Sequence, residues 1–143
     1  MAKKSDFDVN DMRAFTVHPG WAWAICAGVK KQEWRTFLPN PRKGVCAVHC
    51  SKTLTRMEWE REAGLIDSWW GRKLPSYEEL VENWCGKVVA VVNYAACEDD
   101  WERDAYGWRL SGLKKLKKRI FCKGALKLWK MDPAIAKLVV SQI

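Results

Sequence analysis

The sequence lacks the features that mark secreted, membrane-spanning and zinc-binding proteins. Its N-terminus has no apolar run of the kind that forms a signal peptide, and no stretch approaches the roughly 20 apolar residues of a membrane span. None of its six cysteines belongs to a C-x-x-C pair, the spacing typical of structural zinc sites. We therefore expect a cytoplasmic or otherwise intracellular protein, with no membrane contact, metal or cofactor, whose cysteines are reduced and buried.

Internal repeats, low-complexity linkers and a G-x-S-x-G nucleophile elbow are also missing. A chain of 143 residues without a linker fits one domain. We expect the polar segment 1–11 to be flexible and residues 12–143 to form that domain.

Acidic residues are almost missing from two stretches of the chain. Residues 30–56 hold seven basic residues and one acid, Glu33, and residues 109–130 hold nine basic residues and no acid. The formal net charge of +8 would attract polyanions if these two stretches met on one face. The run from Lys114 to Arg119 is either a solvated loop or hairpin, or a patch that tracks phosphates.

Tryptophan is unusually abundant, with ten in the chain. Most tryptophans should serve the core, because aromatic side chains bury large areas. A few exposed ones beside cations would offer a stacking surface for nucleic-acid bases.

The order of predicted elements indicates an α+β domain in which short helices lie between strands of a curled or closed sheet. Turn residues, caps and apolar alternation place the boundaries, and the segment 69–75 is predicted to be a loop. We expect strands at 12–18, 31–37, 45–50, 86–97, 106–110, 119–122 and 124–130. We expect helices at 19–28, 51–64 and 132–140, and one further short helix that begins after Ser76.

Charged residues are concentrated between Gly28 and Arg35, where a helix is predicted to end and a strand to begin. Glu33 and Arg35 are two apart and therefore share a strand face, with Lys31 on the same face. A carboxylate among cations should stay ionised, which makes Glu33 an anchor rather than a general acid. Lys30 and Arg35 offer a point charge and a planar fork to a phosphate.

This segment resembles the G-x-K-x-x-E-x-R signature of the ASCH domain family, the activating signal cointegrator homology domains. The similarity extends over roughly residues 12–131. It is carried by five segments in the family's order: His18–Ile25, Gly28–Arg35, Gly44–Ser51, Tyr106–Trp108 and Gly124–Trp129.

The resemblance implies a PUA-like β-barrel with short flanking helices and a cleft beside the signature. Its implied function is binding of nucleic acid, RNA before DNA, or of a nucleotide. Implied alternatives are hydrolysis of RNA or of a modified nucleoside such as acetylated cytidine, with Lys30, Glu33 and His49 as the catalytic groups. In the branch that acts on acetylated cytidine, a threonine stands where this chain has Glu33.

Three sets of candidate site residues follow, and each has a plainer structural interpretation. Phosphate binding is assigned to Lys30, Lys31, Arg35, Ser51 and Lys52, which could equally form a solvated charged face. Base stacking or cleft lining is assigned to His18, Trp21, Tyr106 and Trp108, which could equally pack in the core. His49 is either a catalyst or a buried side chain with satisfied hydrogen bonds. A third possible function is a protein-interaction module with a tryptophan-rich surface.

Overall fold

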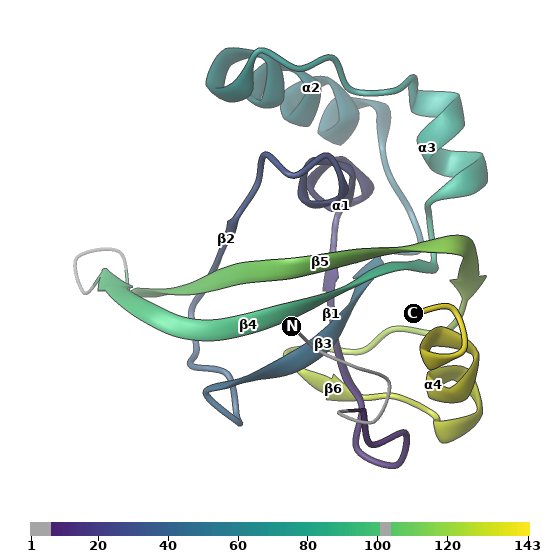
Figure 1. The fold of residues 1–143 in the computed structure, drawn as a ribbon. Helices are drawn as coiled ribbons and strands as arrows, with labels where there is room; N and C mark the ends of the chain where they lie inside the picture. The colour runs from purple at the N-terminus through teal and green to yellow at the C-terminus, as the bar shows by residue number, and fades with distance from the viewer. Residues whose placement is uncertain (1–6, 101–103) are drawn as a thin grey trace.

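The computed structural model describes residues 7–100 and 104–143, the side chains of residues 97–100 excepted. Over these described residues, four helices and six strands make an α+β fold, as predicted (Figure 1). The strands are β1 (Arg13–Val17), β2 (Gln32–Arg35), β3 (Lys43–Cys50), β4 (Lys87–Asp100), β5 (Ala105–Phe121) and β6 (Trp129–Lys130). The helices are α1 (Pro19–Cys26), α2 (Arg56–Trp70), α3 (Tyr77–Asn83) and α4 (Pro133–Val140).

The six strands form one mixed sheet in the order β2-β5-β4-β3-β1-β6. β1 runs parallel to β3, and the other neighbouring strands are antiparallel. Among the described residues no ladder joins the edge strands β2 and β6, so the sheet is open. The expectation of a closed barrel is therefore corrected. With only two residues, β6 offers very little edge for a closing partner.

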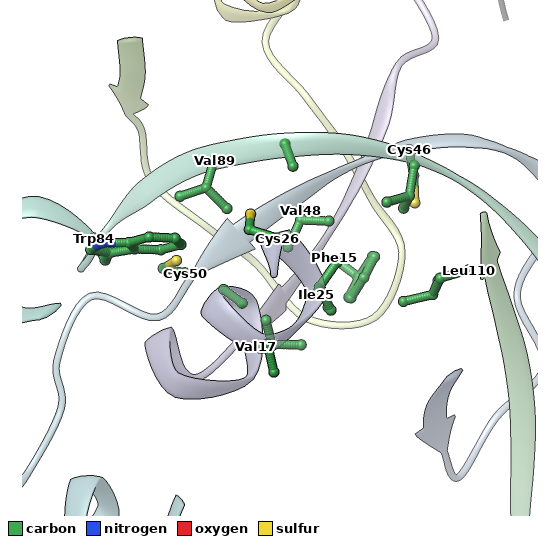
Figure 2. Close-up of a cluster of buried hydrophobic side chains, with 14 of the residues drawn as sticks. Phe15, Val17, Ile25, Cys26, Cys46, Val48, Cys50, Trp84, Val89 and Leu110 are labelled. Carbon is green, nitrogen blue, oxygen red and sulfur yellow. The ribbon is translucent and has the colours of Figure 1, made fainter. Parts of the chain in front are cut away.

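Each face of the sheet carries its own hydrophobic core, because successive strand residues point to opposite faces. On β1, Phe15 belongs to one core and Ala14 to the other. Helices α1, α2 and α3 cover the first face, with α1 next to the sheet and α2 beyond it (Figure 1). Figure 2 shows Phe15, Val48 and Ile25 in the first core.

The second core lies under α4, whose Ala136 and Val139 are fully buried. Of the segment 1–11 that was expected to be flexible, residues 1–6 lie outside the description. Phe7 and Val9 pack against this second core, which fastens residues 7–11 to the domain.

Two helix boundaries differ from the prediction because of specific local interactions. Helix α2 begins at Arg56 rather than Ser51, because Thr55 and Glu58 form a reciprocal capping box. It also continues to Trp70, where Gly71 ends it in the left-handed conformation with a φ of 61°. Residues 69 and 70 are thus helical, and the predicted loop is confined to the segment after them.

Strand β5 is longer than predicted, because two predicted strands and the lysine-rich segment between them form one element. Leu116 is buried in the second core while Lys115 and Lys117 are exposed, so alternation continues through the lysine run. The run is therefore a strand segment in the antiparallel pair of β4 and β5 rather than a loop, and its lysines at 115, 117 and 118 are exposed. In contrast, the strand predicted at 124–130 is reduced to Trp129–Lys130, and Lys127 has a φ of 62°.

Candidate functional site

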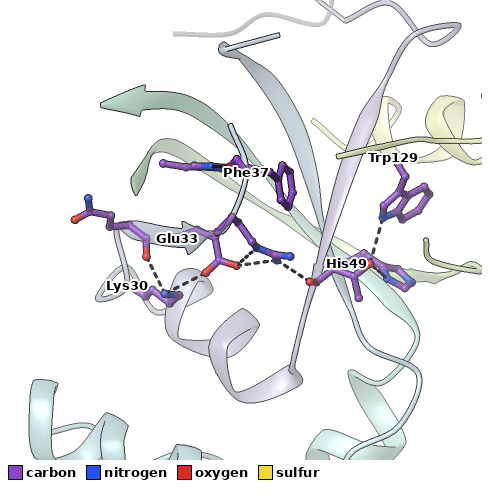
Figure 3. Close-up of polar contacts among 9 residues, drawn as sticks. Lys30, Glu33, Phe37, His49 and Trp129 are labelled. Atoms are coloured by element: carbon purple, nitrogen blue, oxygen red, sulfur yellow. Dashed lines mark hydrogen bonds and ion pairs between the residues drawn. The ribbon is translucent and has the colours of Figure 1, made fainter. Parts of the chain in front are cut away.

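The signature segment forms a compact ion cluster at the end of α1 and the start of β2. Glu33 is 8% exposed, and its Oε1 lies 3.3 Å from Nζ of Lys30. Its Oε2 accepts a hydrogen bond from Nε of Arg35 at 2.8 Å and lies 2.7 Å from Nη2 of the same guanidinium in an ion pair. The predicted side-by-side placement of Glu33 and Arg35 is confirmed by this contact, and Figure 3 shows the Glu33 carboxylate beside Lys30.

Both cations of this ion cluster also donate to main-chain carbonyls. Nη2 of Arg35 donates to the carbonyl of Thr16 at 2.8 Å, and Nζ of Lys30 donates to that of Gln32 at 2.7 Å. Arg35 thereby links edge strand β2 to β1, which is not its neighbour in the sheet. Because much of its donor capacity is used inside the protein, Arg35 is better suited to holding the fold than to gripping a phosphate.

His49, on β3, is buried at 2% exposure and has partners on both ring nitrogens. Nε2 lies 2.8 Å from the carbonyl of Cys122 and 3.2 Å from that of Gly86, so this nitrogen carries the proton. Nδ1 accepts from the hydroxyl of Thr16 at 3.0 Å, and that hydroxyl accepts from Nε1 of Trp129 at 3.2 Å (Figure 3).

Burial lowers the pKa of His49 below its usual value, and the two carbonyls oppose this only in part. The imidazole is therefore neutral and fully hydrogen-bonded at neutral pH. Of the two interpretations of His49, this geometry favours the buried, satisfied side chain over the catalyst, because a general base needs a nitrogen free to take a proton.

Two cavities separate five of the predicted site residues into two groups. The first, here called the tryptophan groove, has a volume of about 770 Å³ and lies between β2, the end of α2 and the middle of β5. Its lining consists of Val29, Lys30, Lys31, Gln32, Trp34, Trp69, Trp70, Arg109, Leu110 and Ser111. Of the predicted site residues, Lys30 and Lys31 line this cavity.

The second, here called the apolar cavity, has a volume of about 700 Å³ and takes His49, Ser51 and Lys52. The two cavities share no lining residue, and neither includes Glu33 or Arg35. Lys30 and His49 were expected around one cleft; here they line different cavities.

Predicted stacking residues are mostly engaged within the protein. Trp108 is 0% exposed and packs edge-on against Phe15 and Phe37, so the idea that it stacks on a base is corrected. Tyr106 is half-buried against the first core. Residue 106 pairs with residue 35, so Tyr106 lies beside Arg35 in the sheet.

Two other candidates from the stacking set lie at α1. His18 lies 2.7 Å from Oε2 of the fully buried Glu62 and 3.4 Å from Oε2 of Glu58, so its ring fastens α1 to α2. Trp21 stacks on Trp69 with ring centroids 6.1 Å apart, and Lys30 lies 5.6 Å from the Trp21 ring centroid. Trp21 therefore packs against Trp69, one of the tryptophans that line the groove, without lining the groove itself.

Sequence reasoning missed the aromatic residues that are exposed in this groove. Trp34 is 44% exposed and Trp69 is 60% exposed. Strand alternation was a usable signal for Trp34, because it lies between Glu33 and Arg35 and so points to the opposite face. No comparable signal existed for Trp69, which was assigned to a loop, nor for Arg109, which comes from a distant strand.

The tryptophan groove combines three tryptophans with three cations. Lys31 and Arg109 supply positive charge together with Lys30, whose Nζ also lies 3.3 Å from Glu33, and no lining residue is acidic. Such a surface attracts an anion and offers flat apolar faces beside it, which is the chemistry that single-stranded nucleic acid requires.

Outside these cavities, three further features bear on function: possible metal ligands, the cysteines and the apolar character of the helices. Across the described side chains, no three His, Cys, Asp or Glu residues come together as a metal site. Five cysteines are free thiols, while the Cys97 side chain lies outside the description. Within residues 7–100 and 104–143, no helix has the length and apolar character that crossing a bilayer requires.

No known family model matches the sequence, and no curated protein matches it.

Proposed function

We propose that this protein binds single-stranded nucleic acid, RNA before DNA, in the tryptophan groove. The observation that carries the proposal is the pairing of exposed Trp34 and Trp69 with Lys30, Lys31 and Arg109 in one cavity without acids. Bases stack on aromatic rings in a sequence-tolerant way while lysine and arginine neutralise the backbone. RNA is placed first because proteins commonly recognise its unpaired, splayed-out bases.

Support also comes from the resemblance of Gly28–Arg35 to the ASCH signature, and we propose ASCH membership and a PUA-like fold on that basis. The ion cluster has a defined part in this proposal. Glu33 holds Lys30 and Arg35 in place, which orients the start of β2 so that Lys31 and Trp34 reach the groove.

Hydrolysis by Lys30, Glu33 and His49 is less well supported. The carboxylate of Glu33 is held by two cations, and both nitrogens of His49 are occupied in the apolar cavity. The protein-interaction alternative uses the same exposed tryptophans, so salt dependence separates it from the proposal: only polyanion binding releases counterions.

Fluorescence anisotropy with a labelled single strand of about 12 nucleotides tests the proposal, since binding sites of this kind cover about 4–16 nucleotides. RNA, DNA and duplex RNA are compared over a range of salt. Trp69→Ala is expected to weaken binding roughly tenfold, because stacking contributes about 1–3 kcal/mol per base. Lys31→Ala and Arg109→Ala should each flatten the slope of log K against log salt by about 0.7.

Lys137→Ala is the matched control, because this exposed lysine of α4 lies outside the groove. The affinity of this control variant for RNA should change only slightly. Thermal melts of every variant establish that the fold is intact. Salt-independent binding, or parent-like affinity in all three groove variants, would reject the proposal.

A further inference from the structure

The apolar cavity is a second concave site that the proposed function does not use. Four chain segments meet there: Thr16 of β1, the end of β3 with residues 51–52, Gly86 before β4, and residues 121–126, which begin at the last residue of β5. Phe121 is 63% exposed and Leu126 is 89% exposed. Large apolar side chains that line a concave site of this size are typical of small-molecule binding.

Main chain rather than side chains forms part of this cavity's wall. A Cβ added to Gly86 would lie 2.6 Å from Cε2 of Phe121, so the aromatic ring lies directly against the Gly86 backbone. A Cβ added to Gly124 would lie 2.7 Å from Cε1 of His49. Any side chain at either glycine would have to displace a ring that borders the cavity, and these positions therefore keep it open.

His49 fastens these segments together. Its Nε2–H reaches the carbonyls of Gly86 and Cys122, which belong to two different walls, while His49 itself lies in another. Thr16 and Trp129 hold the other side of the ring. The cavity is thus preformed, which lowers the entropic cost of binding a ligand.

Charge distinguishes this cavity from a plain hydrophobic patch. Lys52 and Lys123 line it, both are exposed, and no acidic residue is among its lining residues. The hydroxyl of Ser51 donates to the carbonyl of Thr53 at 3.1 Å, so its oxygen remains able to accept a hydrogen bond. An occupant must therefore offer a flat apolar body, a negative group and a polar edge.

We propose that the apolar cavity binds a nucleoside monophosphate as a site separate from the tryptophan groove. Its base lies on the ring of Phe121 with Leu126 beside it, and its phosphate lies between Lys52 and Lys123. A base and ribose fit a cavity of about 700 Å³. A simple acyl anion matches the site less well, because it has no planar face for the Phe121 ring.

Isothermal titration calorimetry with adenosine 5′-monophosphate tests this site on the full chain. Adenosine, inorganic phosphate and octanoate are titrated in parallel. Binding of the monophosphate is expected to be at least tenfold tighter than binding of any of these three, because only it engages the ring and both lysines.

Two substitutions identify the location of binding. Phe121→Ala should weaken monophosphate binding roughly tenfold, and Lys123→Ala should weaken it several-fold and reduce its salt dependence. Leu138→Ala and Lys137→Ala are the matched controls, because both side chains are exposed on α4 away from the cavity. Trp69→Ala should leave monophosphate binding unchanged.

The outcomes separate this inference from the proposed function. Octanoate binding as tightly as the monophosphate, or no monophosphate binding at millimolar concentration, overturns the cavity inference even if RNA still binds the groove. Loss of monophosphate binding in Trp69→Ala with retention in Phe121→Ala also overturns it, because the nucleotide then occupies the groove. Monophosphate binding that depends on Phe121 supports the inference even if RNA binding fails altogether.

Discussion

Glu33→Gln is the sharpest test of how the ion cluster acts. The change removes the charge that lies 2.7 Å from Arg35 Nη2 and 3.3 Å from Lys30 Nζ while keeping the size of the side chain. The cations are mostly buried, with side chains 22% and 14% exposed. The amide oxygen can still accept from Arg35, but the amide NH₂ adds a donor where only acceptors are useful.

Breaking a buried ion pair by removing one partner costs about 3–5 kcal/mol. That range must be reduced here, because Arg35 keeps the carbonyl of Thr16, Lys30 keeps that of Gln32, and both cations retain some water contact. We therefore expect a loss of about 2 kcal/mol in the free energy of unfolding. For a chain of this size the melting temperature should fall by about 6 °C.

Circular dichroism melts and urea titrations at pH 7 measure this loss. Glu60→Gln is the control, because Glu60 is an exposed carboxylate on α2, and its melting temperature should stay near that of the parent. RNA affinity of folded Glu33→Gln should be equal or higher, since a negative charge next to Lys30 has gone.

Two results would refute this reasoning. Unchanged stability of Glu33→Gln would mean that the cluster does not hold β2. A tenfold loss of RNA affinity at a temperature where the variant is folded would mean either that Glu33 contacts the ligand or that the neutral side chain no longer orients Lys31 and Trp34 toward the groove. Arg35→Ala extends the test: because its donors face Glu33 and Thr16, it should lower stability and leave the salt slope of RNA binding nearly unchanged.

Three further predictions concern fold stability and cysteine reactivity. The hydrogen bond to Glu62 raises the pKa of His18 above 6.5. The stabilisation by this pair is therefore complete below pH 6.5 and is lost as pH rises through the raised pKa. Thermal melts of His18→Gln from pH 5 to 9 should lack this pH-dependent part of the stability. Thr55→Ala removes the cap of α2 and should cost about 1 kcal/mol in a urea titration, while the neighbouring Thr53→Ala should cost little. Burial raises the pKa of Cys26 to about 11, so peptide mapping after iodoacetamide treatment at pH 8 should show it largely unmodified, and rapid modification would contradict its burial.

Local signals in the sequence determined much of the secondary structure. Proline after His18 begins α1, Ser76 caps α3 and Asp132 caps α4, as predicted. Caps and turns depend on residues that are neighbours in the chain, and their geometry needs no tertiary partner. The two-residue period of a strand likewise placed Glu33 beside Arg35 before any packing was known.

Tertiary structure alone decided which aromatic residues are available to a ligand. Trp108 and Trp34 both lie on strands with alternating patterns, yet one is 0% exposed and the other 44% exposed. The difference arises because Phe15 and Phe37 enclose Trp108 from distant parts of the chain, and long-range contacts of this kind leave no local sequence signal.

The division of the candidate site into two cavities has the same cause. Sequence order placed Lys30 just before one predicted strand and His49 in the next, and a single cleft was the simplest expectation. In the fold, β2 pairs with β5 and β3 pairs with β1 and β4, so the strand that follows Lys30 is not adjacent to the strand that carries His49. The sequence determined which functional groups each segment carries. Strand pairing decided which of these groups lie close together, because it depends on which distant segments bury each other's apolar faces.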